Sequence, residues 1–141
     1  MRIFTWIMAL MISVNVQAQL TDSVYLSNIH SVRFHVQHNQ QSLPMYRLNS
    51  SDKLFLGFDD MDANIKSYYY TFVLCDYNWR PVNLNPFDYI KGFTQNRISN
   101  YRYSSIALTR YTHYHALLPD QNAMPTMSGN YIVKVYLDSD T

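Results

Sequence analysis

Residues 68–81 read YYYTFVLCDYNWRP and hold three consecutive tyrosines, the only cysteine, and the only tryptophan that follows the first eighteen residues. In an extended segment, even-numbered positions 68–74 form one face and odd-numbered positions 69–75 form the other. Both faces are mostly apolar, which is typical of a strand with neighbours on either side. We therefore predict a central strand from Tyr68 to Asp76.

The cysteine in this stretch, Cys75, is predicted to be a buried residue and not a nucleophile. A reactive thiol needs a lowered pKa, a nearby histidine or helix N-terminus, and access to substrate. Cys75 follows Leu74 in the middle of the predicted strand and has none of these features nearby in the sequence. Free cysteine is among the residue types most often buried.

Residues 1–18, MRIFTWIMALMISVNVQA, have the layout of a secretory signal peptide. Arg2 precedes an apolar run that is too short to span a bilayer, and the segment ends in a small-residue cleavage pattern at Ala18. An uncleaved anchor helix is the alternative interpretation. No cysteine directly follows the cleavage site, so we expect an exported protein without a lipid anchor, with residues 19–141 as one mature domain.

Composition indicates a β-rich domain without a nucleic-acid partner. The 13 tyrosines favour strands, and the absence of glutamate disfavours helices. Removing Arg2 with the signal leaves 11 − 1 = 10 basic residues against 10 acidic ones, a formal charge of zero. A neutral chain lacks the basic footprint that nucleic acid or an anionic membrane surface requires. One cysteine forms no internal disulfide, so stability must come from a packed core.

Alternation of apolar and polar residues predicts seven short strands, which favour a β-sandwich. The predicted strands span residues 32–36, 45–48, 54–58, 68–76, 101–105, 111–118 and 130–137. A short helix is predicted at 86–91, because Asn85 can cap it, Pro86 suits its first position and Gly92 can end it. Residues 59–64, DDMDAN, are predicted as a turn.

The segment SGNYIVKV, residues 128–135, refines this prediction to an immunoglobulin-like sandwich. Such folds carry a tyrosine near the start of strand F, two residues before a core cysteine. Tyr131 fits the tyrosine position, and Val133 occupies the cysteine position. Residues 138–140 would then be the turn after strand F, so we expect a chain that lacks its last strand, with an unpaired sheet edge.

Two groups of side chains are candidates for metal binding. His113 and His115 share a face of one strand, at a spacing that suits zinc if His30, His35 or His38 supplies a third ligand. Such a site would make the protein a small metal-dependent enzyme. The alternative, which we favour, is a pair of solvent-facing strand histidines.

The aspartates of the predicted turn are the second group. Asp59, Asp60 and Asp62 offer hard oxygen ligands for calcium, but the EF-hand spacing and its glutamate are absent. Aspartates are also common in turns, because their side chains bond the local backbone. Exposed tyrosines could instead stack on sugars, so a secreted carbohydrate-binding module is an alternative function.

Residues 54–137 resemble the N-terminal domain of the plug protein of the type IX secretion system, a family found in Bacteroidota. Four segments carry the resemblance in the same order: LFLGFDDMDANIKSYYYTFVLCDYNWRPVNLNPFDYIKGF, NRISNYRYS, YTHYHALLP and SGNYIVKVYLD. Family members continue well beyond this length, which is where this chain departs from them.

The resemblance implies binding and not catalysis. Family members are β-sandwich proteins of the periplasm that cap the periplasmic mouth of the outer-membrane translocon barrel and keep it from leaking. We therefore expect a non-enzymatic component of the type IX secretion system, with that barrel as its partner. No catalytic, cofactor-binding or metal-binding residues and no cofactor are carried over.

Overall fold

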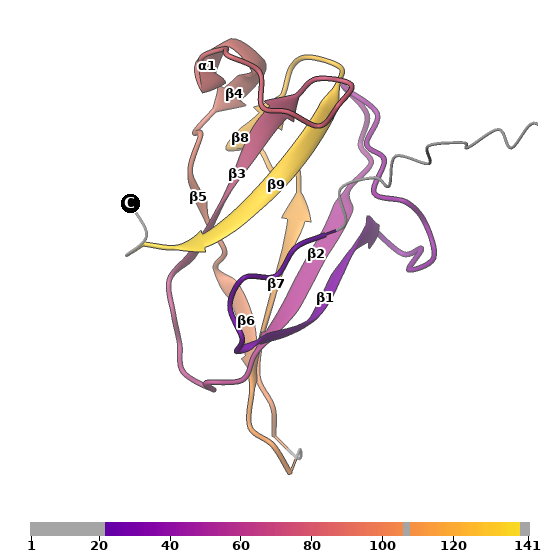
Figure 1. Ribbon diagram of the computed structural model, residues 1–141. Coiled ribbons are helices and arrows are strands. Elements are labelled where there is room, and N and C mark those ends of the chain that lie inside the picture. Colours follow the sequence, from indigo (N-terminus) through magenta and orange to yellow (C-terminus); the bar gives the residue numbers. More distant parts are fainter. Residues whose placement is uncertain (1–21, 106–107, 139–141) are drawn as a thin grey trace, which may run out of the picture.

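The computed structural model describes residues 22–105 and 108–138, which fold into two packed antiparallel β-sheets and a small two-stranded ribbon (Figure 1). The larger sheet has the order β1-β2-β7-β6, the smaller has the order β5-β3-β9, and β4 pairs with β8. The elements are β1 (Ile29–Val36), β2 (Leu54–Asp60), β3 (Tyr68–Cys75), α1 (Pro86–Tyr89), β4 (Ile90–Gly92), β5 (Asn96–Arg97), β6 (Asn100–Tyr103), β7 (Thr112–Leu118), β8 (Ala123–Pro125) and β9 (Asn130–Leu137). The predicted β-sandwich is confirmed. None of the helical structure described is long and apolar enough to cross a membrane.

β3 is the central strand of its sheet, as its two apolar faces predicted. It pairs with β9 without interruption, from Tyr68 opposite Leu137 to Cys75 opposite Asn130, and with β5 on its other edge. Its even-numbered side chains are buried between the sheets, whereas Tyr69, Thr71 and Val73 on the other face are half-buried. β3 therefore contributes one full row of the core.

An aromatic cluster forms the centre of that core. The Tyr114 ring of β7 stacks on Phe58 with ring centroids 5.4 Å apart and meets Tyr68 edge-on at 4.9 Å. Phe58 and Tyr68 also meet edge-on, at 5.0 Å. Edge-to-face and offset contacts at these distances stabilise aromatic pairs beyond the burial of their area. The cluster joins β2 and β7 of one sheet to β3 of the other.

One predicted strand and the predicted helix differ from the structure. Residues 45–48 form no strand, because they lie in the irregular connection between β1 and β2, where the Met45 side chain is exposed. The predicted helix 86–91 ends at Tyr89. Asn85 caps it as expected, accepting a bond from the Phe87 amide at 3.1 Å, but Ile90 becomes extended and starts β4.

Gly92 does not end the helix but lies in the β4–β8 ribbon. Its φ is +103°, and a Cβ atom there would lie 2.1 Å from the Asn122 carbonyl oxygen. The glycine is needed because the two chains approach each other so closely at this point.

The predicted turn at 59–64 begins two residues later than expected. β2 continues through Asp60, and the turn starts at Met61. Because side chains alternate along a strand, Asp59 lies on the outer face of the larger sheet and Asp60 points into the core. The two neighbouring aspartates therefore have different roles.

Asp60 is fully buried and is held by four donors. Its carboxylate accepts hydrogen bonds from Asn28 at 2.7 Å, the Tyr68 hydroxyl at 2.9 Å and the Asp62 amide at 3.0 Å, and forms an ion pair with Lys66 at 2.9 Å. Burial opposes ionisation of Asp60, but the bonds from Lys66, Asn28, Asp62 and Tyr68 outweigh it and hold the pKa of the carboxyl below its usual value.

The lowered pKa of Asp60 predicts an acid-sensitive contribution to stability. A carboxyl whose pKa is lower in the folded state stabilises the fold above its unfolded value of 3.8, and this contribution is lost as the pH falls through the folded value. Urea unfolding of the wild type and Asp60→Asn between neutral pH and acid will measure this. We expect the difference in unfolding free energy to be constant at neutral pH and to shrink below pH 3.8. A difference that does not depend on pH would contradict the assignment.

Two buried tyrosines of β3 predict opposite results for the same substitution. Tyr68 donates to Asp60, whereas the buried Tyr70 hydroxyl has no partner in good hydrogen-bond geometry among the described residues; burial raises its pKa, and the charge of Asp120 and a weak bond to it raise it further. Tyr68→Phe should cost about 1.5–3 kcal/mol, because a bond to a charged group is lost. Tyr70→Phe should be neutral or stabilising, because no well-formed bond is lost and a buried hydroxyl is removed. Chemical denaturation of both variants checks this, and equal losses would contradict it.

Tyr131, at the start of β9, makes the hydrogen bond expected of a corner tyrosine. Its hydroxyl donates to the Met127 carbonyl at 2.9 Å, four residues upstream. Val133 faces the same side as Tyr131 and lies opposite Phe72 of β3. The immunoglobulin-like classification as a whole stays a prediction.

Candidate functional site on the outer face of the larger sheet

A row of stacked rings crosses the outer face of the β1-β2-β7-β6 sheet. His35 of β1 stacks on Phe55 of β2 with centroids 5.1 Å apart, and Phe55 stacks on His115 of β7 at 6.1 Å. His115 in turn stacks on His113 at 5.9 Å. The Phe55 ring lies over Gly57, where an added Cβ would come within 2.7 Å of it. Glycine at this position thus makes room for the row.

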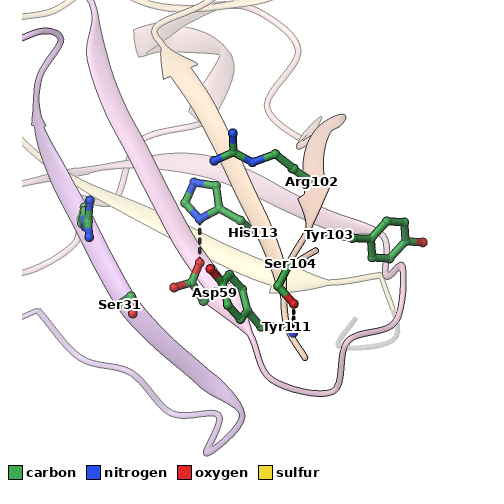
Figure 2. A pocket seen from close by; sticks show the side chains of 8 residues that line it. Ser31, Asp59, Arg102, Tyr103, Ser104, Tyr111 and His113 are labelled. Carbon is green, nitrogen blue, oxygen red and sulfur yellow. Dashed lines mark hydrogen bonds and ion pairs between the residues drawn. The ribbon is translucent and has the colours of Figure 1, made fainter. Parts of the chain in front are cut away.

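Asp59 is hydrogen-bonded to His113 at one end of this row. Cross-strand register places Asp59 opposite His113, and His113 opposite Arg102 of β6. The His113 Nδ1 and Asp59 Oδ1 atoms lie 2.6 Å apart, and both side chains are partly exposed (Figure 2). The pairing of strands therefore brings together two groups that are far apart in the chain.

These residues line an open, polar depression of about 230 Å³. Its lining includes Arg33 of β1 and Arg102 of β6, together with the hydroxyl groups of Ser104 and Tyr111. In the part of the chain that the structure describes, neither arginine forms an ion pair. The Ser104 hydroxyl oxygen accepts a bond from the Tyr111 amide at 3.0 Å and can still donate. Guanidinium and hydroxyl groups donate hydrogen bonds, so the depression suits recognition of polar or anionic groups at the surface.

His115 is biased toward its neutral form. Burial lowers the pKa of His115, and the neighbouring charges of His113 and Arg102 lower it further. Its ring therefore belongs to the apolar stacked row at neutral pH, whereas His113 is paired with a carboxylate.

The predicted metal ligands are not brought together. His35 is separated from His115 by the Phe55 ring, and the His30 ring bonds the Ser27 carbonyl at 3.1 Å. Within residues 22–105 and 108–138, no group of three or more His, Cys, Asp or Glu side chains could hold a metal ion. His113 and His115 do share a face, as predicted, but they are half-buried rather than fully solvent-facing.

The three aspartates considered as calcium ligands, Asp59, Asp60 and Asp62, do not point toward a common site. Asp59 points to the outer face and Asp60 into the core, so their carboxylates lie on opposite sides of the sheet. Asp62 lies in the turn and forms an ion pair with Lys66.

Cys75 is buried, as predicted. Its Sγ atom lies 3.6 Å from the Val73 carbonyl oxygen, and burial raises the pKa of the thiol, with a further contribution from the charge of Asp76. It lies on the side of β3 opposite the main core, where residue 75 forms a bridge with Pro81. A thiol with a raised pKa is a poor nucleophile.

Sequence comparison identifies the family of this fold. A model of the first domain of the type 9 secretion system plug protein matches residues 29–141. The chain belongs to this family. Among solved structures, it resembles a hypothetical protein from Parabacteroides merdae ATCC 43184, with a TM-score of 0.77 and 27% identity. The similarity covers 81% of this chain and 29% of that one, so this chain spans less than a third of that protein. Curated proteins give no match.

Membership of the plug family relates this chain to type 9 secretion. The matched region covers every element of the sandwich, from the first residue of β1 onward. The predicted signal peptide, residues 1–18, lies outside the residues that the structure describes.

Proposed function

We propose that this plug-family chain is a non-enzymatic periplasmic component of the type IX secretion system, which caps the periplasmic mouth of the outer-membrane translocon barrel. The observation that carries the proposal is the family match over residues 29–141. The predicted signal peptide at residues 1–18 agrees with delivery to that compartment.

The geometry supports a binding role. The sandwich is held by strands paired over seven or eight residues, which gives a stiff body with two broad faces. Its thiol is buried, and its Asp59–His113 pair lies in an open depression instead of an enclosed pocket. Enzymes usually surround the reacting groups with a cleft that excludes water.

Affinity capture from outer-membrane extracts tests the proposal. The tagged full-length protein serves as bait, and a neutral secreted β-sandwich of similar size serves as the control bait. We expect the translocon barrel to be recovered with the first bait only. Repeated failure to recover it from extracts that contain the barrel would sink the proposal. Specific binding on a glycan array would favour the carbohydrate-binding alternative instead.

A second measurement addresses the capping role itself. A cell that lacks a cap on a large outer-membrane pore should admit large antibiotics that are normally excluded. Deleting the gene is therefore expected to increase sensitivity to such compounds, and restoring the protein should reverse it. Unchanged sensitivity would argue against capping even if the barrel is captured.

A further inference from the structure

The polar depression on the larger sheet is lined by two arginines that come from opposite edges of that sheet. Arg33 lies on β1 and Arg102 on β6, with β2 and β7 between them. Figure 2 shows Arg102 reaching from β6 toward His113 on the neighbouring strand. All the lining residues lie between Ser31 and His113, so the shape of the depression does not depend on β9. Two positive charges are thus held over one hollow, an arrangement that attracts an anion.

A bulge in β1 directs Arg33 to the outer face of the sheet. Residues directly opposite each other in paired strands point to the same face. His30 lies opposite Asp59, and Arg33, three residues further along β1, lies opposite Gly57, only two residues back along β2. Without the extra residue, Arg33 would point toward the core.

The conformation of this bulge is also unusual. Ser31, which lines the depression, has a φ of +54°, a value that is uncommon for a residue other than glycine. Bulges are frequent beside functional sites, where they change the direction of a side chain. The strand therefore departs from regular geometry at the point where it supplies two lining residues.

The balance of charge favours a ligand with a single negative charge. Arg33 and Arg102 are opposed by one carboxylate, that of Asp59, which repels a doubly charged group more strongly than a singly charged one. The planar guanidinium group holds a carboxylate through two parallel hydrogen bonds. Asp59 uses Oδ1 for its bond to His113, which leaves Oδ2 as an acceptor for a hydroxyl group, and the Ser104 hydroxyl can donate.

We propose that this depression binds a small organic acid that has one carboxylate group and neighbouring hydroxyl groups. The carboxylate lies between the two guanidinium groups, and a hydroxyl group of the ligand donates to Asp59. The volume of about 230 Å³ equals that of about eight water molecules at roughly 30 Å³ each, which suits a ligand of that size. This site is independent of the proposed capping role, and neither result tests the other.

An NMR titration of the full-length exported protein with glycerate tests the site. We expect a Kd of about 1 mM, because an open site leaves part of a small ligand in water. The guanidinium signals of Arg33 and Arg102 should shift, whereas that of Arg97, an exposed residue of β5 in the other sheet, should not. Glycerol lacks the carboxylate, propionate lacks the hydroxyl groups and resembles an acidic side chain, and inorganic phosphate carries more charge. Each should bind at least about fivefold more weakly at equal ionic strength.

Three glutamine variants locate the binding. Arg33→Gln and Arg102→Gln should each weaken glycerate binding about tenfold or more, and Arg97→Gln should leave it unchanged. All three side chains are exposed, so Tm should stay close to that of the wild type. Absence of glycerate binding, equal binding of propionate, tighter binding of phosphate, or equal effects of Arg102→Gln and Arg97→Gln would overturn the proposal.

Discussion

Replacing Tyr114 with alanine is expected to lower the free energy of unfolding by about 4 kcal/mol, the range seen for aromatic residues removed from cores. Its ring is fully buried against Phe58 and Tyr68, and its hydroxyl accepts from the Lys66 amide at 2.8 Å and donates to the Asn64 carbonyl at 3.3 Å. The substitution leaves a cavity between the sheets and removes the acceptor of the Lys66 amide, whereas the Asn64 carbonyl keeps the bond from the Thr112 hydroxyl at 3.4 Å. Thermal unfolding should shift Tm down by about 10 °C or more.

Tyr103→Ala is the matched control for this prediction. Tyr103 lies on the neighbouring strand β6, packs edge-on against Tyr101 and is 51% exposed. Its removal should change stability by about 0.5 kcal/mol or less, as is usual for surface positions. If the two substitutions have similar effects, the Tyr114 cluster is not the centre of the core.

Replacing Asp60 with alanine is expected to cost about 3 kcal/mol, because it leaves several donors, one of them a charged lysine, without their acceptor. The Asn28 amide, the Tyr68 hydroxyl and the Lys66 ammonium all lose a bond of less than 3 Å. Lys66 is partly exposed and can turn toward water, which keeps the loss below that of a fully buried ion pair. Urea unfolding at neutral pH measures the effect.

Asp62→Ala separates burial from charge in this prediction. Asp62 pairs with the same lysine but is exposed, so its removal should cost about 1 kcal/mol or less. A loss as large as that of Asp60→Ala would mean that the ion pairs of Lys66, and not the buried carboxylate, hold the turn.

The long strands could be predicted from sequence because each shows its own alternation. β3 has apolar residues on both faces, and its place between two neighbours followed from that pattern. The short strands β4, β5 and β8 have two or three residues, too few to show a period. They exist because distant segments pair through the backbone, and no local pattern reports such pairing.

The candidate site could not be predicted from the sequence, for a related reason. Asp59 and His113 are 54 positions apart, and they meet only because β2 and β7 pair in one particular register. Asp60 was placed in a turn because aspartate favours turns, whereas its burial depends on Lys66 and Tyr68, which come back to it after the chain reverses. Residue type indicated the chemistry available, and strand pairing decided which groups meet.

Because Cys75 is buried, covalent modification of its thiol reports that the protein has unfolded around it. In the folded chain the thiol is shielded and its pKa is raised, so attack of its thiolate on the disulfides of other molecules is slow. Once the chain opens, the same sulfur can attack a disulfide of another molecule, which forms a mixed disulfide and releases the other half of that disulfide as a thiol. The fraction of molecules that carry a disulfide-linked adduct after oxidative stress therefore measures how many have opened at the Cys75 end of β3. A non-reducing gel determines this fraction.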